Sequence, residues 1–561
     1  MIDENRGLGE TSLTMKTMIP ASYQPPLPTE KFILNEKPGG EAVPLDVLFV
    51  GGGPAGLAGA IELAKLVKKE LAVNPQFPKP EIGILEKAQR LGDHCLSGAV
   101  VNPGPLRELF PELKDSHFPF RGAVKSDRVY FMTENHAFRI PTPPTMHNKG
   151  NYFASISELT RWMGTKAEEL GVNILTGFPA ESLLVDDGKV VGVRTAAAGL
   201  DREGKPSSRF MPPTDISSRF TVLSEGTRGS LTQAYLKWQG ADGKCPQIYA
   251  LGVKEIWKVK KAHEAVIHTM GWPLPSDAFG GSFFYPMGPE QVALGLVVGL
   301  DYKAHSLDTH GLLQKLKNHP LFSEILKEGQ ILEWGAKTIP EGGFDAIPQK
   351  LQGAGAIVVG DGGGFVNVPA LKGIHYAIQS GILAARTIFD ALKANSSDLQ
   401  NYQKMVSESF ISKDLYKTRN MRHAFKSGFY RGAIKAGLMT LTGGAFPGGR
   451  RKAESDAAEP RSLDDQPSLF SGSLSITKVD GVFRSGNTTR DDIPKHLIVG
   501  KDIPPELADF YSHVCPAGVY ERKGDHLVIN APNCVDCKAT DVVGPRWTPR
   551  EGGSGPKYQE M

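Results

Sequence analysis

A glycine-rich turn near the start of the chain, GGGPAG, has the spacing of a phosphate-binding loop. In the pattern G-x-G-x-x-G, Gly51 would make the turn, Gly53 would let the backbone approach a diphosphate, and Gly56 would allow a helix to pack closely on a strand. Amide groups at the N-terminus of the following helix favour a negatively charged group. The turn therefore predicts a dinucleotide-binding site, and by itself it fits NAD as well as FAD.

A second glycine-rich segment favours FAD over NAD. The string GAIVVGDGGGFVNVP places Asp361 directly after a predicted buried strand and before a helix. Flavoproteins with two dinucleotide-binding motifs use such an acid on the ribityl chain or on the diphosphate. A solvated aspartate in a turn is the alternative interpretation of this residue.

Three cysteines toward the C-terminus have spacing that suits a metal cluster. Cys515 is followed by Cys534 and Cys537, and the two-residue spacing of the last pair lets neighbouring thiolates reach one iron–sulfur cluster. A zinc site is a weaker hypothesis, because the histidine closest in sequence is His526. We expect the two other cysteines to be ordinary core or loop thiols.

A βαβ unit is predicted to hold the first glycine turn. The run DVLFV precedes the turn, LAGAIELAKLVKKE follows it with helical spacing, and the short strand EIGILE ends in Glu86. Strand, turn, helix and strand in this order are typical of a doubly wound sheet. The acid that ends the second strand binds a ribose hydroxyl in such sheets, so we expect Glu86 to contact the cofactor.

The composition is that of an ordinary folded protein with more than one domain. The 561 residues exceed what one core usually fills. With 64 basic and 61 acidic residues the net charge is +3, which gives no reason to expect nucleic-acid binding. Five cysteines do not make a disulfide framework, and the acidic start of the chain resembles neither a secretory signal nor a transit peptide. We therefore expect a reducing compartment.

A basic segment, residues 411–452, combines ten Lys and Arg with one acid, Asp414. No run of the chain reaches the 18 apolar residues of a membrane-spanning helix. The segment instead carries apolar residues at helical spacing, as in helices that lie on an anionic bilayer surface. A helix packed on the core with a solvated basic face would show the same pattern. The apolar residues are Phe425, Phe429, Ala433, Ile434, Leu438 and Leu441.

Longer strings of residues resemble the electron transfer flavoprotein–ubiquinone oxidoreductase family. The resemblance covers residues 46–561 and includes LEKAQRLGDHCLSGAV, HNKGNY, LGVKEIW, HTMGWPL, GGSFFYPM, GFVNVPALKGIH, CPAGVYE and EGGSGPKY. It implies a monomer with FAD and an iron–sulfur cluster that passes electrons from reduced electron transfer flavoprotein to ubiquinone. It also implies that the basic segment contacts the membrane.

Further site residues follow from the resemblance alone. Asn367, Lys372 and Gly373 would lie near the isoalloxazine ring, where hydrogen bonds tune the flavin potential. Gly280 and Gly281 match glycines whose backbone meets the quinone carbonyl. A missing Cβ would let a flat ring approach the main chain, and a bulge at a strand edge is the alternative explanation of this pair.

The expected cluster lacks one ligand. The family pattern C-x-x-C-x-x-C has Thr540 at its last position here, after Cys534 and Cys537. A threonine hydroxyl stays protonated at neutral pH and is a weak ligand for iron. Three outcomes stay open: a [4Fe–4S] cluster completed by water, hydroxide or Asp541, a [3Fe–4S] cluster on three cysteines, or no cluster.

We therefore expect an α/β protein (α+β overall) with three folded units. A FAD domain of the two-dinucleotide-binding type is interrupted by a β-rich quinone domain, and a ferredoxin-like iron–sulfur domain follows. The predicted boundaries are 1–44 for an extended arm, 45–240 with 345–410 for the FAD domain, 241–344 for the quinone domain, 411–452 for the membrane segment, 453–470 for a linker and 471–561 for the iron–sulfur domain.

The predicted function is that of an electron-transferring-flavoprotein dehydrogenase, in which no residue acts as a nucleophile. We expect the protein on the cytoplasmic face of a bacterial inner membrane, or on the matrix side of the mitochondrial inner membrane in a eukaryote. Three alternatives are a FAD enzyme similar to geranylgeranyl reductase, a quinone-binding flavoprotein without a cluster, and a non-catalytic membrane scaffold that has lost electron transfer. The C-terminal cysteine unit argues against the first alternative, and the complete FAD fingerprint argues against a non-catalytic scaffold.

Overall fold

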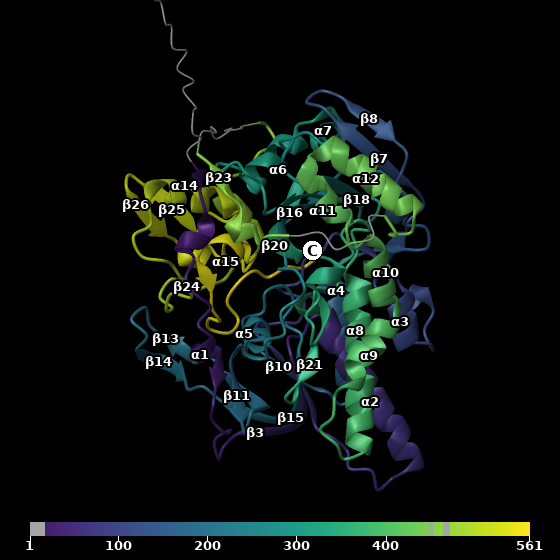
Figure 1. Ribbon diagram of the computed structural model, residues 1–561, viewed down its shortest axis with the longest axis vertical. Helices are drawn as coiled ribbons and strands as arrows, with labels where there is room; N and C mark the ends of the chain where they lie inside the picture. The colour runs from purple at the N-terminus through teal and green to yellow at the C-terminus, as the bar shows by residue number, and fades with distance from the viewer. Residues whose placement is uncertain (1–16, 447–448, 450–452, 464–471) are drawn as a thin grey trace, which may run out of the picture.

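Two large β-sheets and a smaller C-terminal unit make up the fold, which confirms the mixed α/β class (Figure 1). The first sheet lies in the lower half of the view and the second in the upper half, with the yellow C-terminal unit at the left. The structure is a computed structural model. It describes residues 17–446, 449, 453–463 and 472–561.

The first sheet contains the predicted βαβ unit. β3 (Val43–Val50) and β4 (Ile82–Glu86) pair in parallel and are connected by α2 (Pro54–Val73). β15 (Asp215–Leu223) pairs in parallel with β3 and with β22 (Ala356–Val358), so segments far apart in sequence share one sheet, as predicted for an interrupted FAD domain. The other strands of this nine-stranded sheet are β2 (Ile33–Leu34), β10 (Asn173–Thr176), β11 (Ala180–Asp186), β12 (Lys189–Thr195) and β21 (Gln352–Gly353).

Two long helices pack on the first sheet and on each other. α8 (Ile374–Lys393) follows the second glycine-rich turn and runs beside α2 (Figure 1). Their backbones approach so closely that a Cβ on Gly381 would lie 2.1 Å from the carbonyl oxygen of Ala55. Most of α8 is buried, because its apolar residues face both the sheet and α2. This contact fixes the helix N-termini that follow the two glycine-rich turns.

The second sheet has seven strands and contains the region that the sequence assigned to quinone. Its order is β20-β16-β19-β18-β17-β7-β8. Two of these strands, β7 and β8, come from the stretch that the sequence assigned to the FAD domain, and β2 of the first sheet comes from the predicted arm. β7 pairs with β17 and β2 pairs with β11, each across more than 100 residues, and such pairing leaves no local pattern in the sequence. The bounds are β7 (Asp127–Met132), β8 (Ala137–Ile140), β16 (Tyr249–Lys258), β17 (Val266–Gly271), β18 (Gly280–Pro286), β19 (Gln291–Gly299) and β20 (Gln330–Pro340).

The C-terminal unit shares its core with the second sheet. Phe510 and Val482 belong to the same buried cluster as Leu251 of β16 and Leu296 of β19. The cysteine-bearing loops are therefore held against the second sheet by apolar packing. The elements of this unit are α13 (Lys478–Arg484), β24 (Leu497–Ile498), α14 (Pro505–Val514), β25 (Tyr520–Lys523), β26 (His526–Ile529), α15 (Ala539–Val543) and β27 (Arg546–Trp547).

The basic segment includes a surface helix, α12 (Phe429–Leu441). Tyr430, Ile434 and Leu441 on this helix are 73%, 69% and 84% exposed. A helix packed on the core would cover these side chains, so the exposure favours the membrane-surface interpretation. Residues 447–448 and 450–452 of the basic segment, 464–470 of the linker and the side chain of Phe429 lie outside the described residues.

Shorter elements connect these units. Among the described helices, none is long and apolar enough to cross a membrane. The remaining elements are β1 (Thr17–Met18), α1 (Thr29–Phe32), β5 (Val100–Val101), α3 (Gly104–Leu109), β6 (Phe120–Ala123), β9 (Tyr152–Ala154), α4 (Ile156–Glu168), β13 (Ala198–Leu200), β14 (Pro206–Met211), α5 (Ser230–Trp238), α6 (Thr309–Lys317), α7 (Pro320–Leu326), α9 (Asn401–Glu408), α10 (Phe410–Thr418), α11 (Met421–Ala424) and β23 (Arg461–Ser462).

The close contact between α2 and α8 predicts the effect of adding one methyl group. Gly381→Ala places a Cβ 2.1 Å from a backbone oxygen, and we expect it to destabilise the protein. The expected cost is about 1–3 kcal/mol, as for other overpacked cores, seen as a lower midpoint of thermal unfolding. Gly437→Ala is the matched control, since a Cβ there meets no described atom within 4 Å. An unchanged midpoint in Gly381→Ala would contradict this account of the helix contact.

Candidate functional site

One cavity of about 1240 Å³ brings together regions that the sequence assigned to different ligands. It is lined by the first glycine turn, by the N-terminal part of β18 and by α12. The lining includes Gly53 from the glycine turn, Gly280 from β18 and Leu441 from α12. A ligand bound at the turn and a ligand entering beside α12 would therefore share one continuous space.

A different structural feature explains the presence of glycine at each of the three positions of the turn. Gly51 adopts a φ of +110°, and a Cβ there would lie 2.4 Å from the Ser224 carbonyl oxygen. A Cβ on Gly56 would lie 2.2 Å from the Gly51 carbonyl oxygen, so this glycine lets α2 approach the strand. At Gly53, which borders the cavity, a Cβ would meet no described atom within 4 Å. The turn thus leaves open, at its second glycine, the space that a diphosphate requires.

Two acids border the same cavity. Glu86 accepts hydrogen bonds from the backbone amides of Gly52 and Ala88, each at 2.8 Å, so it also holds the turn. Asp361 is deeply placed, and burial raises the pKa of its carboxyl group although the Thr227 hydroxyl donates to it at 3.1 Å. Glu86 and Asp361, which the sequence predicted to bind the cofactor, are 275 residues apart in the chain but border the same cavity.

The loop before α8 contributes to the cavity wall. Asn367 and Lys372 are joined by two backbone hydrogen bonds of 2.8 and 3.2 Å. Lys372 and Gly373 line the large cavity, whereas Asn367 is buried and lines a neighbouring cavity of about 450 Å³. Of the three residues assigned to the flavin ring by resemblance, two thus border the large cavity.

Gly280 and Gly281 also line the large cavity. A Cβ on Gly280 would lie 2.1 Å from the Val297 carbonyl oxygen, and one on Gly281 would lie 2.4 Å from that of Thr269. Neighbouring strands of the second sheet therefore require glycine at both positions, whatever ligand binds beside them. The sequence left a ligand ring and a bulge at a strand edge as explanations of this pair, and close contact with both neighbouring strands is a third, which depends on how the strands pair.

A histidine and a tyrosine in the cavity wall were missed by the sequence reasoning. His268 on β17 and Tyr285 on β18 share a hydrogen bond of 2.6 Å between Nε2 and the phenol oxygen. Burial lowers the pKa of His268 to about 3 and raises that of Tyr285. The pair is therefore neutral at physiological pH. Both residues lie in strings of the family resemblance, which was the signal that could have singled them out.

The three C-terminal cysteines are brought together and buried. Burial raises the pKa of the Cys537 thiol, and the neighbouring Cys515 and Cys534 raise it further. The chemistry of these donors suits an iron–sulfur cluster, with three thiol groups in place of four. Thr540, at the fourth position of the pattern, lies beside the phenol of Tyr520.

Asp541, one candidate for the missing ligand, has other partners. Its Oδ2 accepts from Arg228 Nε at 2.5 Å, and its Oδ1 accepts from the Trp547 amide at 3.0 Å. Arg228 and Lys538 hold the pKa of this carboxyl group low despite its burial. A carboxylate anchored in this way is a poor candidate for the fourth iron ligand, which leaves water or hydroxide for a four-iron cluster.

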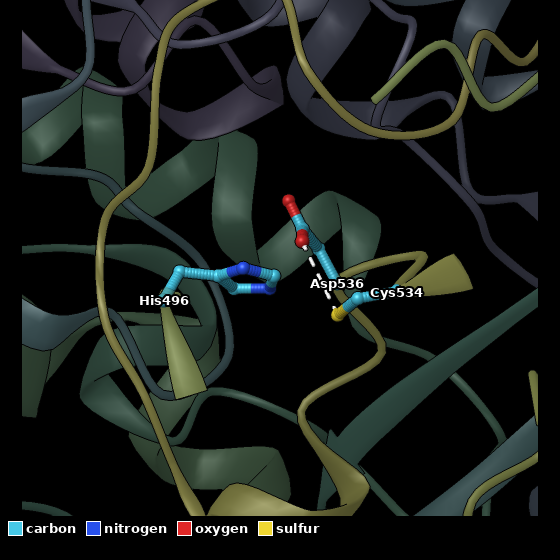
Figure 2. A group of neighbouring side chains, drawn as sticks. All are labelled: His496, Cys534 and Asp536. Carbon is cyan, nitrogen blue, oxygen red and sulfur yellow. Dashed lines mark hydrogen bonds between the residues drawn. The ribbon is translucent and has the colours of Figure 1, made fainter. Parts of the chain in front are cut away.

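Figure 2 shows a second group of possible metal ligands beside the cysteines: His496, Cys534 and Asp536. Their ligand atoms lie within 4.8 Å of one another, and the Cys534 thiol is 3.7 Å from Asp536 Oδ1. Asp536, however, already pairs with Lys87 at 2.5 Å and with Arg550 at 2.9 Å. Two cations around one carboxylate disfavour a further cation, so we interpret Asp536 as the anchor of this loop.

Two family models match regions of this chain. Residues 249–339 match the family model described as "ETF-QO, ubiquinone-binding", and residues 472–559 match "Electron transfer flavoprotein-ubiquinone oxidoreductase, 4Fe-4S". The fold is similar to a solved geranylgeranyl bacteriochlorophyll reductase-like protein from Thermoplasma acidophilum, with a TM-score of 0.56. That match has 18% identity and covers 72% of this chain and 96% of the other, so it shows a shared fold alone.

Two curated relatives match over nearly the whole chain. The mitochondrial electron transfer flavoprotein-ubiquinone oxidoreductase of Oryza sativa is 39% identical, over 93% of this chain and 94% of its own length. The mitochondrial protein of the same name from Homo sapiens is 36% identical, over 92% of this chain and 89% of its own length. The chain belongs to the electron transfer flavoprotein–ubiquinone oxidoreductase family.

Proposed function

We propose that the protein oxidises reduced electron transfer flavoprotein and reduces ubiquinone to ubiquinol. The observation that carries this proposal is the single large cavity. It joins a dinucleotide-type glycine turn, the region that matches a ubiquinone-binding family model, and a surface helix with exposed apolar side chains. Electron transfer then needs no nucleophile, and the chain's task is to position its cofactors and exclude water.

FAD supplies the redox chemistry of this reaction when it is bound. We propose that Gly51, Gly53 and Gly56 receive its diphosphate, and that the N-terminus of α2 contributes amide groups and a positive dipole end. Glu86 and Asp361 would accept hydrogen bonds from the ribose and ribityl hydroxyls. Asn367, Lys372 and Gly373 remain proposed for the flavin end, with Asn367 acting through the backbone pair that holds Lys372.

Ubiquinone would enter beside α12 and reach Gly280 and Gly281. Ala433, Gly437 and Thr440 of α12 line the cavity, while Ile434 and Leu441 are exposed on the same helix. A quinone with an isoprenoid tail stays in lipid, so an entrance formed by an exposed apolar helix suits this substrate. The His268–Tyr285 pair would offer polar groups to the ring.

We further propose a monomer that attaches to one face of the membrane through the basic segment. Basic residues beside an exposed apolar helix face favour an anionic bilayer surface. The relatives from rice and human are named as mitochondrial proteins. In a mitochondrion the chain would lie on the matrix side of the inner membrane, and in a bacterium on the cytoplasmic face.

Cys515, Cys534 and Cys537 would hold the iron–sulfur cluster. The match to the 4Fe-4S family model supports this assignment, and Thr540 sets this chain apart from the four-cysteine pattern. With Asp541 bound to Arg228, we propose that water or hydroxide completes a four-iron cluster, and a three-iron cluster is the alternative.

The proposed reaction is tested with its two substrates. Under anaerobic conditions, the purified holoprotein should oxidise reduced electron transfer flavoprotein and convert a short-chain ubiquinone to the quinol, followed by absorbance. Denatured protein is the control. If the flavoprotein stays reduced while NADPH is consumed and isoprenoid double bonds are saturated, the protein is instead an enzyme of the geranylgeranyl reductase type.

The open space at Gly53 predicts a variant that loses FAD without losing its fold. Gly53→Val would place methyl groups where the diphosphate binds, and no described atom lies within 4 Å of a Cβ there. We expect FAD affinity to fall at least about tenfold, or more than about 1.4 kcal/mol. FAD content is read from absorbance, and the thermal midpoint of the apoprotein should not change. Gly40→Val, also in open space, is the control and should keep its FAD. Full FAD content in Gly53→Val would place the diphosphate elsewhere.

Thr540→Cys should complete the cysteine pattern. We expect iron to stay at about four per chain and the cluster to resist oxygen better, because a fourth thiolate closes the exposed iron. A rise from about three irons in the parent to about four would instead indicate the three-iron alternative. Iron and acid-labile sulfide are measured together with the paramagnetic resonance spectrum. Thr540→Ala leaves three thiolates and should resemble the parent protein. Iron that is absent from both the parent and Thr540→Cys would exclude a cluster at these cysteines.

A further inference from the structure

A second cavity of about 450 Å³ lies beside the large one, and the proposed function does not use it. It is lined by residues of α8 and α10 and by the loop that carries His147. His147 and Lys417 in its lining are exposed, so this cavity reaches the protein surface. Two exposed residues of α12, Tyr430 and Leu441, line the large cavity, whereas the lining of this one includes several polar and charged groups.

Lys372 stands in the wall between the two cavities. Its positive charge lowers the pKa of His268 in the large cavity and of His375 in the second, in each case after burial as the larger cause. The ammonium group is therefore close to both spaces. Among the described residues, five border both cavities, and Lys372 is the one of them that titrates. The five are Pro144, Thr145, Lys372, Met421 and Thr440.

The groups around Lys372 suit an exchange of protons. Burial lowers its pKa to about 8, against the opposing effect of Asp127 on β7. Its Nζ donates one hydrogen bond, to the carbonyl oxygen of Ala370 at 3.3 Å. Two N–H groups of the ammonium are then left for other acceptors. By contrast, His268 has a pKa of about 3 and the pKa of Tyr285 is raised, so neither exchanges protons near neutral pH.

On the surface side, the second cavity holds a chain of polar groups. Tyr376 donates from its hydroxyl to Asp414 Oδ2 at 3.3 Å, and Asn367 Nδ2 donates to that hydroxyl oxygen at 3.4 Å. Asp414 is 38% exposed and lies 3.7 Å from Lys417. These groups connect the exposed side of the second cavity to Asn367, whose backbone is hydrogen-bonded to that of Lys372.

We propose that Lys372 carries the protons consumed in quinone reduction from the second cavity into the large one. Quinone, two electrons and two protons give quinol, with the electrons supplied through FAD from two molecules of reduced electron transfer flavoprotein. Each proton leaves Lys372 Nζ as a quinone oxygen gains its O–H bond, and Nζ is then reprotonated from the second cavity. The isoprenoid tail fills the entrance beside α12 during the reaction, so a separate route keeps water and protons available. This inference rests on the proposed function.

The test compares three variants in the full-length holoprotein. FAD-reduced protein is mixed anaerobically with a short-chain ubiquinone, and flavin reoxidation and proton uptake are followed together, the latter with a pH indicator. Lys372→Ala should slow both at least about tenfold with an unchanged KM for quinone. Lys372→Arg keeps the charge but does not release a proton, so it should be equally slow. Lys404→Met removes a lysine from the surface of α9 and should behave as the parent protein.

Two further readouts separate proton transfer from a structural role. Methylammonium added to Lys372→Ala should restore the rate, because a small amine can occupy the vacated space. In the parent protein the rate should fall as the pH rises through about 8, where Lys372 loses its proton, and Lys372→Ala should lack this decrease. Competitive acetylation of the parent protein by acetic anhydride, read by mass spectrometry, should show Lys372 becoming reactive over the same pH range.

Several results would overturn the inference. These are full activity in Lys372→Ala, restoration by Lys372→Arg, or a lysine that becomes reactive only near the ordinary pKa of its side chain. The acetylation profile needs no variant, so it decides the matter even if Lys372→Ala loses FAD. A parent protein that does not reduce quinone at all would refute the proposed function, whereas an active parent with an unaffected Lys372→Ala would refute the proton route alone.

Discussion

The contact between the backbone of the first glycine turn and its neighbours fixes the rest of the site. Gly51 presses against the Ser224 carbonyl group, and the Ser224 hydroxyl lies 2.8 Å from the carbonyl oxygens of both Val50 and Gly51, which share its single O–H donor. At the start of the helix that follows this turn, Gly381 of α8 meets the backbone of Ala55 in the first turn of α2. These contacts leave no room for side chains, so the turn, α2 and α8 have one arrangement. The cradle at Gly53 and the loop that holds Lys372 follow from it.

The large cavity explains how a substrate that stays in lipid can reach the protein, although none of the described helices could span a membrane. The second sheet supplies an apolar and glycine-rich wall, and α12 brings the opening to an exposed apolar surface. Electrons and the quinone ring can meet inside the protein while the tail stays in lipid. A titratable group in the wall of this cavity, such as Lys372, can then have a chemical role.

On the cluster side, charged groups that surround the cysteines have structural tasks. Asp536 is held by Lys87 and Arg550, and Asp541 is held by Arg228. Lys87 directly follows Glu86, so one ion pair ties the end of the FAD-binding strand to the cysteine loop. Asp536 and Asp541, the acids closest in sequence to Thr540, are thus both held in ion pairs. Neither is therefore a candidate for the fourth ligand of the cluster. These ion pairs act together with the apolar packing of the C-terminal unit on the second sheet to hold the two regions together.

The sequence alone determined the family, the two glycine turns, the paired acids Glu86 and Asp361, and the three cysteines with Thr540. These features depend on residue types at short spacing, where local geometry dictates which residue fits. Only the tertiary structure decided that β7 and β8 join the second sheet, that Gly280 and Gly281 face carbonyl oxygens of neighbouring strands, and that Asp541 binds Arg228. It also showed His268 with Tyr285 and placed Lys372 between two cavities. The physical reason is that sheet pairing, ion pairs and cavities join residues far apart in the chain, and such contacts leave no periodic pattern in a single sequence.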